Sequence, residues 1–336
     1  IGPLVVAQLR TSHPDTKIVG LDLGFFASCL TNSVILPECN IDIQYFKDVR
    51  NVTDKQLDGV DAVVHLAAIS NDPMGNTFED VTLQVNYKAG IELAKKAKRK
   101  GAQSYVFASS CSMYGSADDA PKTEESPLNP LTAYARSKVF TEEALKDLAD
   151  ENFVVTCLRF STACGMSPRL RLDLVLNDFV AAAVSSGEIT IFSDGTPWRP
   201  LIYVKDMARA IDWAIGRDAT NGGDCLSVNV GRNDWNFQVK DLAEAVASVI
   251  PGLKVSINKD AMPDKRSYRV NFDLFKNLAP DHQPECTLAD AIEELRDGLY
   301  AMDFNDTHFR DSKMIRLKVL NQLRSEGLLD EDLKWK

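Results

Sequence analysis

Short, nearly continuous apolar runs alternate with longer segments of helical period along the first half of the chain. The runs occupy residues 17–22, 43–46, 61–66, 104–108 and 154–158. Runs of this length are typical of strands that are buried on both faces of a parallel sheet. Residues 79–100 place apolar side chains at helical spacing and end in a Lys/Arg-rich turn before Gly101, which is a helix stop signal. Strands that alternate with helices predict an α/β fold with a doubly wound parallel sheet.

The first residues resemble the opening turns of a helix, because Pro3 stands where a missing N–H costs nothing. Asp22 ends the first predicted strand and follows Gly2 by 20 residues. A helix start followed at this spacing by an acid at a strand end is the second half of a dinucleotide-binding fingerprint. We therefore expect a further strand and a glycine-rich turn ahead of Ile1. The alternative is an ordinary surface helix before an ordinary strand.

The second half of the chain changes character. A cluster of proline and arginine at residues 167–171 and a turn at 194–197 separate shorter elements. They predict a smaller, mixed α/β lobe that packs closely on the first part, since no repeat or long linker intervenes. Beyond residue 302, charged and apolar residues alternate, and residues 314–320 predict an amphipathic helix that packs on its own body or on a partner.

Composition and charge exclude several classes of protein. With 45% hydrophobic and 26% charged residues the chain is an average globular protein, and its apolar runs are far shorter than the ~20 residues that span a bilayer. The net charge of −10 argues against a broad nucleic-acid-binding face. The seven scattered cysteines, without a Cys-x-x-Cys pair, suit a reducing cytoplasm, and four isolated histidines predict no metal site. We therefore expect a cytoplasmic protein without nucleic-acid or membrane partners.

Hydroxyl and amine side chains follow the fourth predicted strand. Ser110 is the second residue beyond it, and Tyr134 and Lys138 are four residues apart, on one face of a helix. Ligands of open α/β sheets bind beyond the carboxyl ends of the strands, where Ser110 would meet one. A lysine beside a phenol favours the phenolate and lowers the pKa of the tyrosine toward the range of a general base. Taken singly the pair is a weak signal, because chance often places Tyr and Lys on a solvated helix face.

The combination of these residues with several others resembles the extended short-chain dehydrogenase/reductase family of nucleotide-sugar epimerases, dehydratases and reductases. The resemblance covers about residues 1–300. Ser110, Tyr134 and Lys138 fall on the family's catalytic triad. Other segments that look like family motifs are His65-Leu66-Ala67-Ala68, Asp48-Val49, Asn86, Leu158-Arg159-Phe160, and Arg199 followed by Tyr203-Val204-Lys205-Asp206.

The resemblance implies a role for each residue of the triad. Tyr134 removes the proton of a sugar hydroxyl while hydride moves to the nicotinamide, Lys138 holds the nicotinamide ribose, and Ser110 orients the reacting oxygen. NAD is favoured over NADP, because Asp22 would accept hydrogen bonds from ribose hydroxyls and repel a 2′-phosphate. The implied cofactor-binding residues are Gly2, Asp22, Asp48, Val49, Leu66, Ala67, Ala68, Asn86, Tyr134, Lys138 and Phe160.

A nucleoside diphosphate sugar is the substrate that the resemblance implies. Arginine binds phosphate oxygens bidentately, and Arg199 and Arg266 look like the diphosphate ligands. The full set of implied substrate-binding residues is Ser110, Ser112, Thr162, Asn177, Arg199 and Arg266. The implied division is an NAD-binding Rossmann domain at residues 1–165 and 201–230, a substrate lobe at 166–200 and 231–302, and a C-terminal helical extension at 303–336.

Departures from the family pattern narrow the reaction. The family's 4,6-dehydratases carry an Asp-Glu pair after the triad serine, where this chain has Cys111 and Ser112. We therefore expect epimerisation or oxidation by hydride transfer at C4. Thr162 replaces the asparagine of many 4-epimerases, which speaks against simple galactose-type epimerisation. The segment 167–174 is similar to a subgroup that modifies nucleotide-linked sugars for surface polysaccharides.

Two other functions stay open at this stage. One is an NAD(P)H-dependent reductase of 4-keto nucleotide sugars, which would release its oxidised cofactor. The other is a catalytically idle scaffold that binds a dinucleotide, although binding alone does not require Ser110, Tyr134 and Lys138 together. Members of the family commonly form homodimers through the helices of Asn86 and Tyr134, and the resemblance implies the same here.

Overall fold

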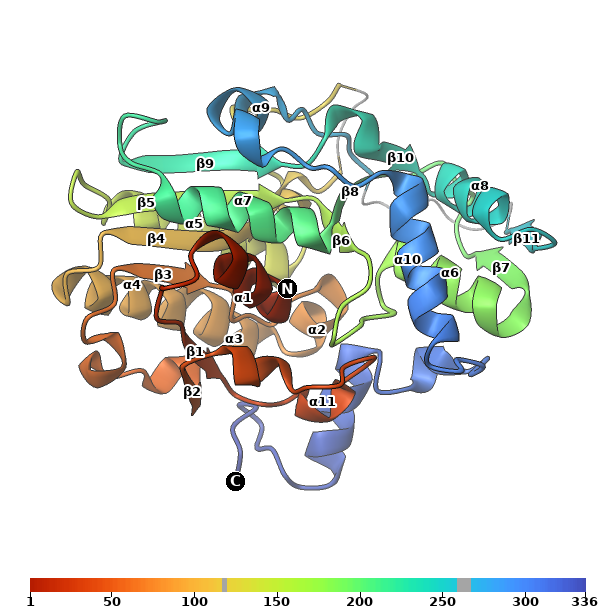
Figure 1. Ribbon diagram of the computed structural model, residues 1–336, viewed down its shortest axis with the longest axis horizontal. Coiled ribbons are helices and arrows are strands. Elements are labelled where there is room, and N and C mark those ends of the chain that lie inside the picture. Colours follow the sequence, from red (N-terminus) through yellow and green to blue (C-terminus); the bar gives the residue numbers. More distant parts are fainter. Residues whose placement is uncertain (117–119, 259–266) are drawn as a thin grey trace.

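The computed structural model describes residues 1–116, 120–258 and 267–336. A parallel sheet in the order β3-β4-β5-β9 forms its centre, and the parallel pair β1-β2 lies on the β3 side (Figure 1). This confirms the expected α/β fold with a parallel, doubly wound sheet. The strands are β1 (Val19–Asp22), β2 (Ile43–Phe46), β3 (Ala62–His65), β4 (Ser104–Ser110), β5 (Val154–Phe160), β6 (Thr162–Cys164), β7 (Glu188–Ile191), β8 (Trp198–Tyr203), β9 (Cys225–Val230), β10 (Asn236–Gln238) and β11 (Lys254–Ile257).

Helices cover both faces of the central sheet (Figure 1). The helix expected to carry Tyr134 and Lys138 is α5, and the helix expected at the start of the chain is α1. The helices are α1 (Gly2–Ser12), α2 (Asp72–Thr77), α3 (Glu79–Thr82), α4 (Ala89–Arg99), α5 (Ala133–Lys146), α6 (Val175–Ser186), α7 (Val204–Gly216), α8 (Val239–Val249), α9 (Asp273–Leu278), α10 (Leu288–Tyr300) and α11 (Arg316–Ser325). The strand expected ahead of Ile1 stays a prediction.

Successive residues of β4 serve opposite faces of the sheet. Tyr105 and Phe107 are fully buried in a cluster with residues of α4 and α5, including Leu145. Val106, between them, packs in the cluster that contains Val5 of α1 and residues of α7. Alternate side chains of a strand point to opposite faces of the sheet. Because helices cover both faces here, β4 needs apolar side chains on both of its faces, which gives the nearly continuous apolar run.

A π-helical stretch interrupts the helix expected at residues 79–100. It runs over Leu83–Lys88 and joins α3 to α4 in one continuous helical segment. Asn86 lies in it and is almost fully buried. Such stretches insert an extra residue per turn and are frequent at functional sites.

The smaller lobe has a core of its own, to the right of the central sheet in Figure 1. The chain leaves the carboxyl end of β5 and enters the lobe through β6, which pairs with β8, while β7 pairs with β11. Leu176 of α6, Leu242 of α8 and Leu295 of α10 are fully buried there. This is the mixed α/β lobe that the sequence predicts.

The last part of the chain returns to the central sheet. From α10 it passes beneath the molecule to α11 and ends near β1 and β2 (Figure 1). Leu320, Leu329 and Leu333 are buried in one cluster with Met74 and Phe78, which belong to or follow α2. Of the two alternatives for the C-terminal helix, it packs on its own body.

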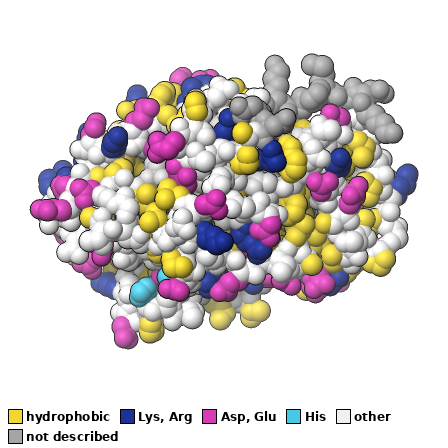
Figure 2. Space-filling model, turned by 90° about the horizontal axis from the view of Figure 1, so that it is seen from above, with side chains coloured by type: hydrophobic (Ala, Val, Ile, Leu, Met, Phe, Trp, Pro, Cys, Tyr) yellow, Lys and Arg dark blue, Asp and Glu magenta, His cyan; other side chains and the backbone are white. Residues whose placement is uncertain are grey.

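The surface carries mixed charge. On the face shown in Figure 2, Lys and Arg side chains lie among Asp and Glu side chains, without a broad basic area among the described residues in view. Within the described ranges, no helix combines the length and apolar character that crossing a bilayer requires.

Candidate functional site

The carboxyl end of β4 and the first turn of α5 bring the expected triad together. Ser110 is the last residue of β4, and its side chain lies near enough to the phenol of Tyr134 to lower the pKa of that phenol. The Ser110 hydroxyl also donates to the Ser112 hydroxyl at 2.9 Å. At the start of α5, the Thr132 hydroxyl accepts from the amide of Ala135 and caps the helix. The cap sets the position of Tyr134 in the first turn.

Lys138 lies one turn after Tyr134. Its Nζ donates to the carbonyl oxygen of Ala108 at 2.7 Å and lies 5.5 Å from the centre of the Tyr134 ring. Burial lowers the pKa of Lys138 to about 8, and the charge of Glu142 acts in the opposite direction. The ammonium is therefore held at the strand end, beside the phenol, as the spacing of four residues predicts.

The pKa of Tyr134 differs from the expectation. Burial raises it to about 12, although the side chain of Ser110 and the charge of Arg171 lower it. We expected Lys138 to bring this pKa toward neutrality, but in this structure desolvation outweighs the favourable charges. At neutral pH Tyr134 is consequently a neutral phenol that needs further positive charge nearby to lose its proton.

A buried ion pair supports the triad from behind. Arg159 of β5 donates to Glu142 of α5 through Nε at 3.1 Å and Nη2 at 2.7 Å. Glu142 also accepts from the hydroxyls of Ser109 and Ser227, at 2.5 and 2.9 Å. This carboxylate ties α5, one turn beyond Lys138, to strands β4, β5 and β9.

Asn86 holds the segment that follows β3. Its side-chain oxygen accepts from the amide of Ile69 at 2.8 Å, and its Nδ2 donates to the Ile69 carbonyl and the Ser137 hydroxyl at 3.0 and 3.1 Å. The expected cofactor-lining residues 66–68 lead directly into Ile69. Phe160 lies opposite Ser110 in the β4–β5 register and is buried. The structure thus gathers these predicted residues at the same edge of the sheet.

Two acids mark the ends of β1 and β2. The carboxylate of Asp22 accepts from the amide of Gly24 at 2.6 Å, and its side chain remains exposed. Asp48 is buried, and its carboxylate accepts from Arg50 at 2.6 to 3.0 Å. Val49, next to it, is also buried. Asp22 is therefore accessible to a ligand, whereas the carboxylate of Asp48 is held by Arg50.

The N-terminus of α1 has the character of an anion site. The positive charges of Arg171, Arg316 and Arg169 act on the start of α1. A methyl group added at Gly2 would meet no heavy atom within 4 Å, so the first turn borders open space. Helix N-termini bind phosphate through their N–H groups and dipole. The residues present therefore fit the pyrophosphate of a dinucleotide.

Arg199 lies in β8 on the side of the triad. Tyr268, which is buried, lies within electrostatic range of both Arg199 and Tyr134. Burial raises the pKa of Tyr268 far above its ordinary value. Sequence reasoning did not single out Tyr268, whose only signal was its place beside the expected ligand Arg266. Arg266 lies outside the described residues.

The two other expected substrate ligands differ in accessibility. Thr162 is half-buried at the start of β6. Asn177 is almost fully buried, and its amide accepts from the Gly165 N–H and donates to the Arg171 carbonyl, both at 2.9 Å. In this structure Asn177 holds backbone of the lobe, and its role as a ligand stays a prediction.

Sequence reasoning missed Arg171. Its guanidinium donates to both carboxylate oxygens of Asp173 at 2.9 Å and to the Ser70 hydroxyl at 3.0 Å. Its charge acts both on Tyr134 and on the start of α1. The signal in the sequence was the pair of arginines within the proline and arginine cluster at residues 167–171, and no role was assigned to Arg171 itself.

Gly75 was also missed. It lies in the short helix α2, and a methyl group there would lie 3.0 Å from the Cβ and the amide nitrogen of Tyr134. Its absence of a side chain lets α2 approach the start of α5 closely. A lone glycine within a helical segment was the available signal.

Cys111 and His65 serve the structure. The thiol of Cys111 is fully buried and donates to the Arg159 carbonyl at 3.0 Å, and burial raises its pKa well above the ordinary range. The imidazole of His65 is buried, which lowers its pKa to about 3 and keeps it neutral. Neither group is suited to exchange protons at this site near neutral pH.

Comparison with known families agrees with this geometry. Residues 1–231, more than half of the chain, match the NAD dependent epimerase/dehydratase family. The chain belongs to this family. The match confirms the resemblance to extended short-chain dehydrogenases/reductases and the NAD-dependent character that it implies.

Curated members of the family show which proteins the chain is similar to. It is 31% identical over 179 residues to an uncharacterized UDP-glucose epimerase, YtcB, of Bacillus subtilis, covering 52% of this chain and 54% of the relative. It is 26% identical over 258 residues to a putative UDP-glucose 4-epimerase of Methanocaldococcus jannaschii, covering 73% and 81%. The chain thus spans about half the length of YtcB.

Solved structures of the same fold match nearly the whole chain. MoeE5 in complex with UDP-glucose and NAD has a TM-score of 0.75 at 22% identity, covering 90% of this chain and 95% of that one. TunA, an NAD-dependent NDP-hexosamine 5,6-dehydratase, has the same TM-score and identity and covers 91% and 95%. At this level of identity the matches show the fold.

Proposed function

We propose that this protein transfers hydride between NAD and C4 of the sugar in a nucleoside diphosphate sugar, either as an epimerase or as a C4 dehydrogenase. The observation that carries the proposal is the convergence of Ser110, Tyr134 and Lys138 at the carboxyl end of β4. Membership of an NAD-dependent family supports the cofactor. The arginines around the start of α1 supply the charge that its pyrophosphate requires.

Each triad side chain has a definite task in this proposal. Bound NAD supplies the hydride acceptor, and the protein supplies position and charge. Tyr134, in its deprotonated form, takes the proton of the C4 hydroxyl as that carbon is oxidised, and Ser110 shares a hydrogen bond with the same oxygen. Lys138, 5.5 Å from the phenol ring, stabilises the phenolate through its charge. In an epimerase Tyr134 then returns the proton after the hydride returns to the other face of the sugar.

The residues after Ser110 favour this reaction over elimination of water. Elimination needs an acid and a base positioned on the departing groups. Here the first position is the buried thiol of Cys111, which faces a backbone carbonyl, and the second is the hydroxyl of Ser112. We therefore do not propose 4,6-dehydration.

A UDP-hexose is the substrate that we propose to test first. The names of the curated relatives and the UDP-glucose complex of MoeE5 support this choice. We propose that Arg199 and Arg266 bind its diphosphate and that Thr162 faces the sugar. In this scheme residues 166–200 and 231–302 form the substrate lobe, and residues 1–165 and 201–230 bind NAD.

The first experiment is acid extraction of the purified protein, with chromatographic quantification of released dinucleotide, followed by incubation with UDP-glucose and UDP-galactose. Near-stoichiometric NAD and interconversion of the two sugars support an epimerase. Formation of NADH with a 4-keto product supports a dehydrogenase. Protein that lacks NAD but oxidises NADPH with a 4-keto sugar would establish the reductase instead. Protein that binds no dinucleotide, and converts neither UDP-sugar when NAD is added, would overturn the proposal.

We further propose that the protein is a cytoplasmic homodimer in polysaccharide precursor synthesis. Phe140 on the outside of α5 is 39% exposed, and its ring lies 5.7 Å from that of Tyr87. An aromatic pair on two neighbouring helices suits burial against a second copy. All seven cysteines are free thiols, as a reducing compartment requires. Light scattering of the protein and of Phe140→Asp, expected as dimer and monomer, tests the assembly.

A further inference from the structure

The last eight residues lie beside the strand ends that carry Asp22 and Asp48. We call residues 329–336 the C-terminal strap. The indole Nε1 of Trp335 donates to the carbonyl of Leu23 at 2.8 Å, and its ring centre lies 5.7 Å from that of Phe25. Leu23 directly follows Asp22, so the strap is attached at the first residue beyond the acid.

A second attachment runs through Arg50. The same guanidinium that holds Asp48 donates through Nη1 to the Asp332 carbonyl at 2.8 Å and through Nη2 to the Leu333 carbonyl at 3.4 Å. The Arg50 side chain is only 11% exposed. Because a guanidinium donates in several directions at once, Arg50 joins the end of β2 to the strap.

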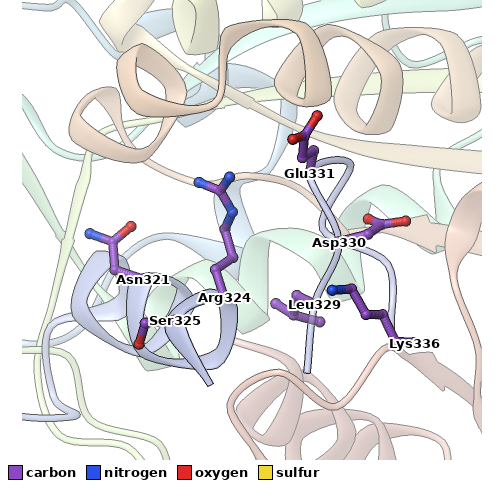
Figure 3. A pocket seen from close by; sticks show the side chains of 7 residues that line it. All are labelled: Asn321, Arg324, Ser325, Leu329, Asp330, Glu331 and Lys336. Carbon is purple, nitrogen blue, oxygen red and sulfur yellow. The ribbon is translucent and has the colours of Figure 1, made fainter. Parts of the chain in front are cut away.

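The strap rests on a buried base and is open on its outer side. Leu329 and Leu333 are buried, and Leu329 pairs with Trp335 as an antiparallel bridge that closes the strap on itself. Figure 3 shows a groove between α11 and the strap, with Arg324 reaching into it from the helix and Glu331 and Lys336 on the opposite side. This groove measures about 440 Å³ and is lined mainly by polar and charged side chains. The strap is thus attached to the strand ends on one side and packed at its base against α2 and α11.

We propose that the C-terminal strap forms the outer wall of the adenosine half of the dinucleotide site and slows release of NAD. This inference rests on the proposed function, because it takes Asp22 as the ligand of the adenosine ribose. Asp22 stays exposed although its neighbour Leu23 is bound to Trp335, so the strap borders the ribose position without filling it. Two attachments, one after the end of β1 at Leu23 and one after the end of β2 at Arg50, hold this wall in place.

A wall beside the adenosine is expected to slow the dissociation of NAD. A ligand leaves faster when a partly exposed wall is removed, since most changes in affinity appear in the dissociation rate. Trp335 is 43% exposed, so its replacement alters the wall while the buried Leu329 and Leu333 remain. An epimerase that keeps NAD through many turnovers would gain directly from such a wall.

The test compares wild type with Trp335→Ala by equilibrium dialysis and by stopped-flow displacement of bound NAD. We expect the dissociation constants of NAD and AMP to rise about tenfold, through a faster release of the ligand. The affinity for nicotinamide mononucleotide, which lacks adenosine, should stay unchanged. Tyr300→Ala, which removes an exposed aromatic side chain on α10, is the matched control and should leave all three affinities unchanged.

A second variant, Arg50→Lys, preserves the charge beside Asp48 but cannot reach the carboxylate and both carbonyls together. It should also speed the release of NAD, with its melting temperature recorded to verify folding. If both variants fold and bind NAD as tightly as wild type or more tightly, the proposal that the strap retains NAD is wrong. Tighter binding would mean that the strap obstructs the dinucleotide site. If the wild type binds no NAD, the proposed function fails as well, so the two failures are distinguishable.

Discussion

The triad and the C-terminal strap border the same edge of the sheet. The triad residues are close together in the sequence, whereas the strap is held by contacts between residues that are far apart in the sequence. Ser110, Tyr134 and Lys138 come from one stretch of chain, and α5 alone sets the spacing of the last two. The strap depends on hydrogen bonds between residues 312 and 282 positions apart, at Leu23–Trp335 and Arg50–Asp332. The spacing of two residues on one helix can be read from the sequence. Contacts between segments that are far apart in the sequence cannot.

The two regions also differ in support. Behind the triad, the buried pair Arg159 and Glu142 ties α5 to three strands. The strap has a buried base but a largely exposed outer side. We therefore expect substitutions near the triad to affect chemistry or folding and substitutions in the strap to affect ligand retention.

The largest expected effect separates chemistry from binding. Tyr134→Phe removes the proton acceptor, and turnover should fall about a thousandfold, within the range for loss of general acid–base catalysis. The affinity for NAD should stay within about twofold, as measured by dialysis. Tyr300→Phe, at an exposed position, should keep full activity. Undiminished turnover of Tyr134→Phe would remove this residue from the mechanism.

The support behind the triad gives the next effect. Glu142→Gln leaves the buried Arg159 without its full partner, and the free energy of unfolding should fall by about 3 kcal/mol in urea titrations. Glu143→Gln on the exposed side of the same helix is the control and should change it by less than about 0.5 kcal/mol. Equal stability of the two variants would show that the ion pair contributes little.

Asp22 tests the adenosine end without touching the strap. Asp22→Ser should weaken NAD binding about tenfold, because a charged acceptor for the ribose hydroxyls is lost, and should relax the preference for NAD over NADP. Asp15→Ser, at an exposed position after α1, is the matched control. An unchanged ratio of the NAD and NADP dissociation constants would mean that Asp22 does not contact the ribose.

Gly75 probes how closely α2 must approach the triad. Gly75→Ala places a methyl group 3.0 Å from Tyr134 and should displace the phenol by a few tenths of an ångström. We expect kcat to fall about fivefold, since small misplacements of catalytic groups are costly. Gly216→Ala at the end of α7 meets no atom within 4 Å and should be neutral. If both variants retained full kcat, the contact would be irrelevant to catalysis.

The smallest effect is a change in titration. Burial lowers the pKa of Lys138 to about 8, so its charge is lost as the pH rises through that value, well before the ordinary 10.5. The resonance of ¹³C-methylated Lys138, assigned by its absence in Lys138→Met, should titrate with this midpoint. Glu142→Gln should shift the midpoint further down, because Glu142 raises this pKa. A midpoint near 10.5 would contradict the burial of the ammonium.

Part of the fold was predictable from residue patterns. All five expected strands formed, and β2 has the expected bounds. β4 extends two residues beyond its expected end and includes Ser110, because pairing with β5 continues to Phe160. The helix expected at residues 79–100 ends at Arg99, one residue early, and its π-helical stretch, which was not expected, contains Asn86, whose side chain contacts Ile69 and Ser137.

The candidate site was predictable to a similar degree. The spacing of Tyr134 and Lys138 predicted a shared helix face, and the resemblance to a family added Ser110, but neither predicted the direction of the Tyr134 pKa. That direction depends on how much water the surrounding segments exclude, which no local pattern reports. Arg171 was overlooked because its importance lies in reaching Ser70 and the start of α1 from another part of the fold.

Local spacing and side-chain chemistry were enough to predict the parallel sheet and the shared helix face of Tyr134 and Lys138, and the resemblance to a family was needed to predict the triad. The first two depend on periodicity within one element or on the order of elements along the chain. The burial of Tyr134, the hydrogen bonds from Arg50 to Asp48 and to the strap, and the course of the strap depended on the tertiary structure. Such contacts form only when segments separated by some 280 to 310 positions pack together, and many sequences of the same pattern pack differently.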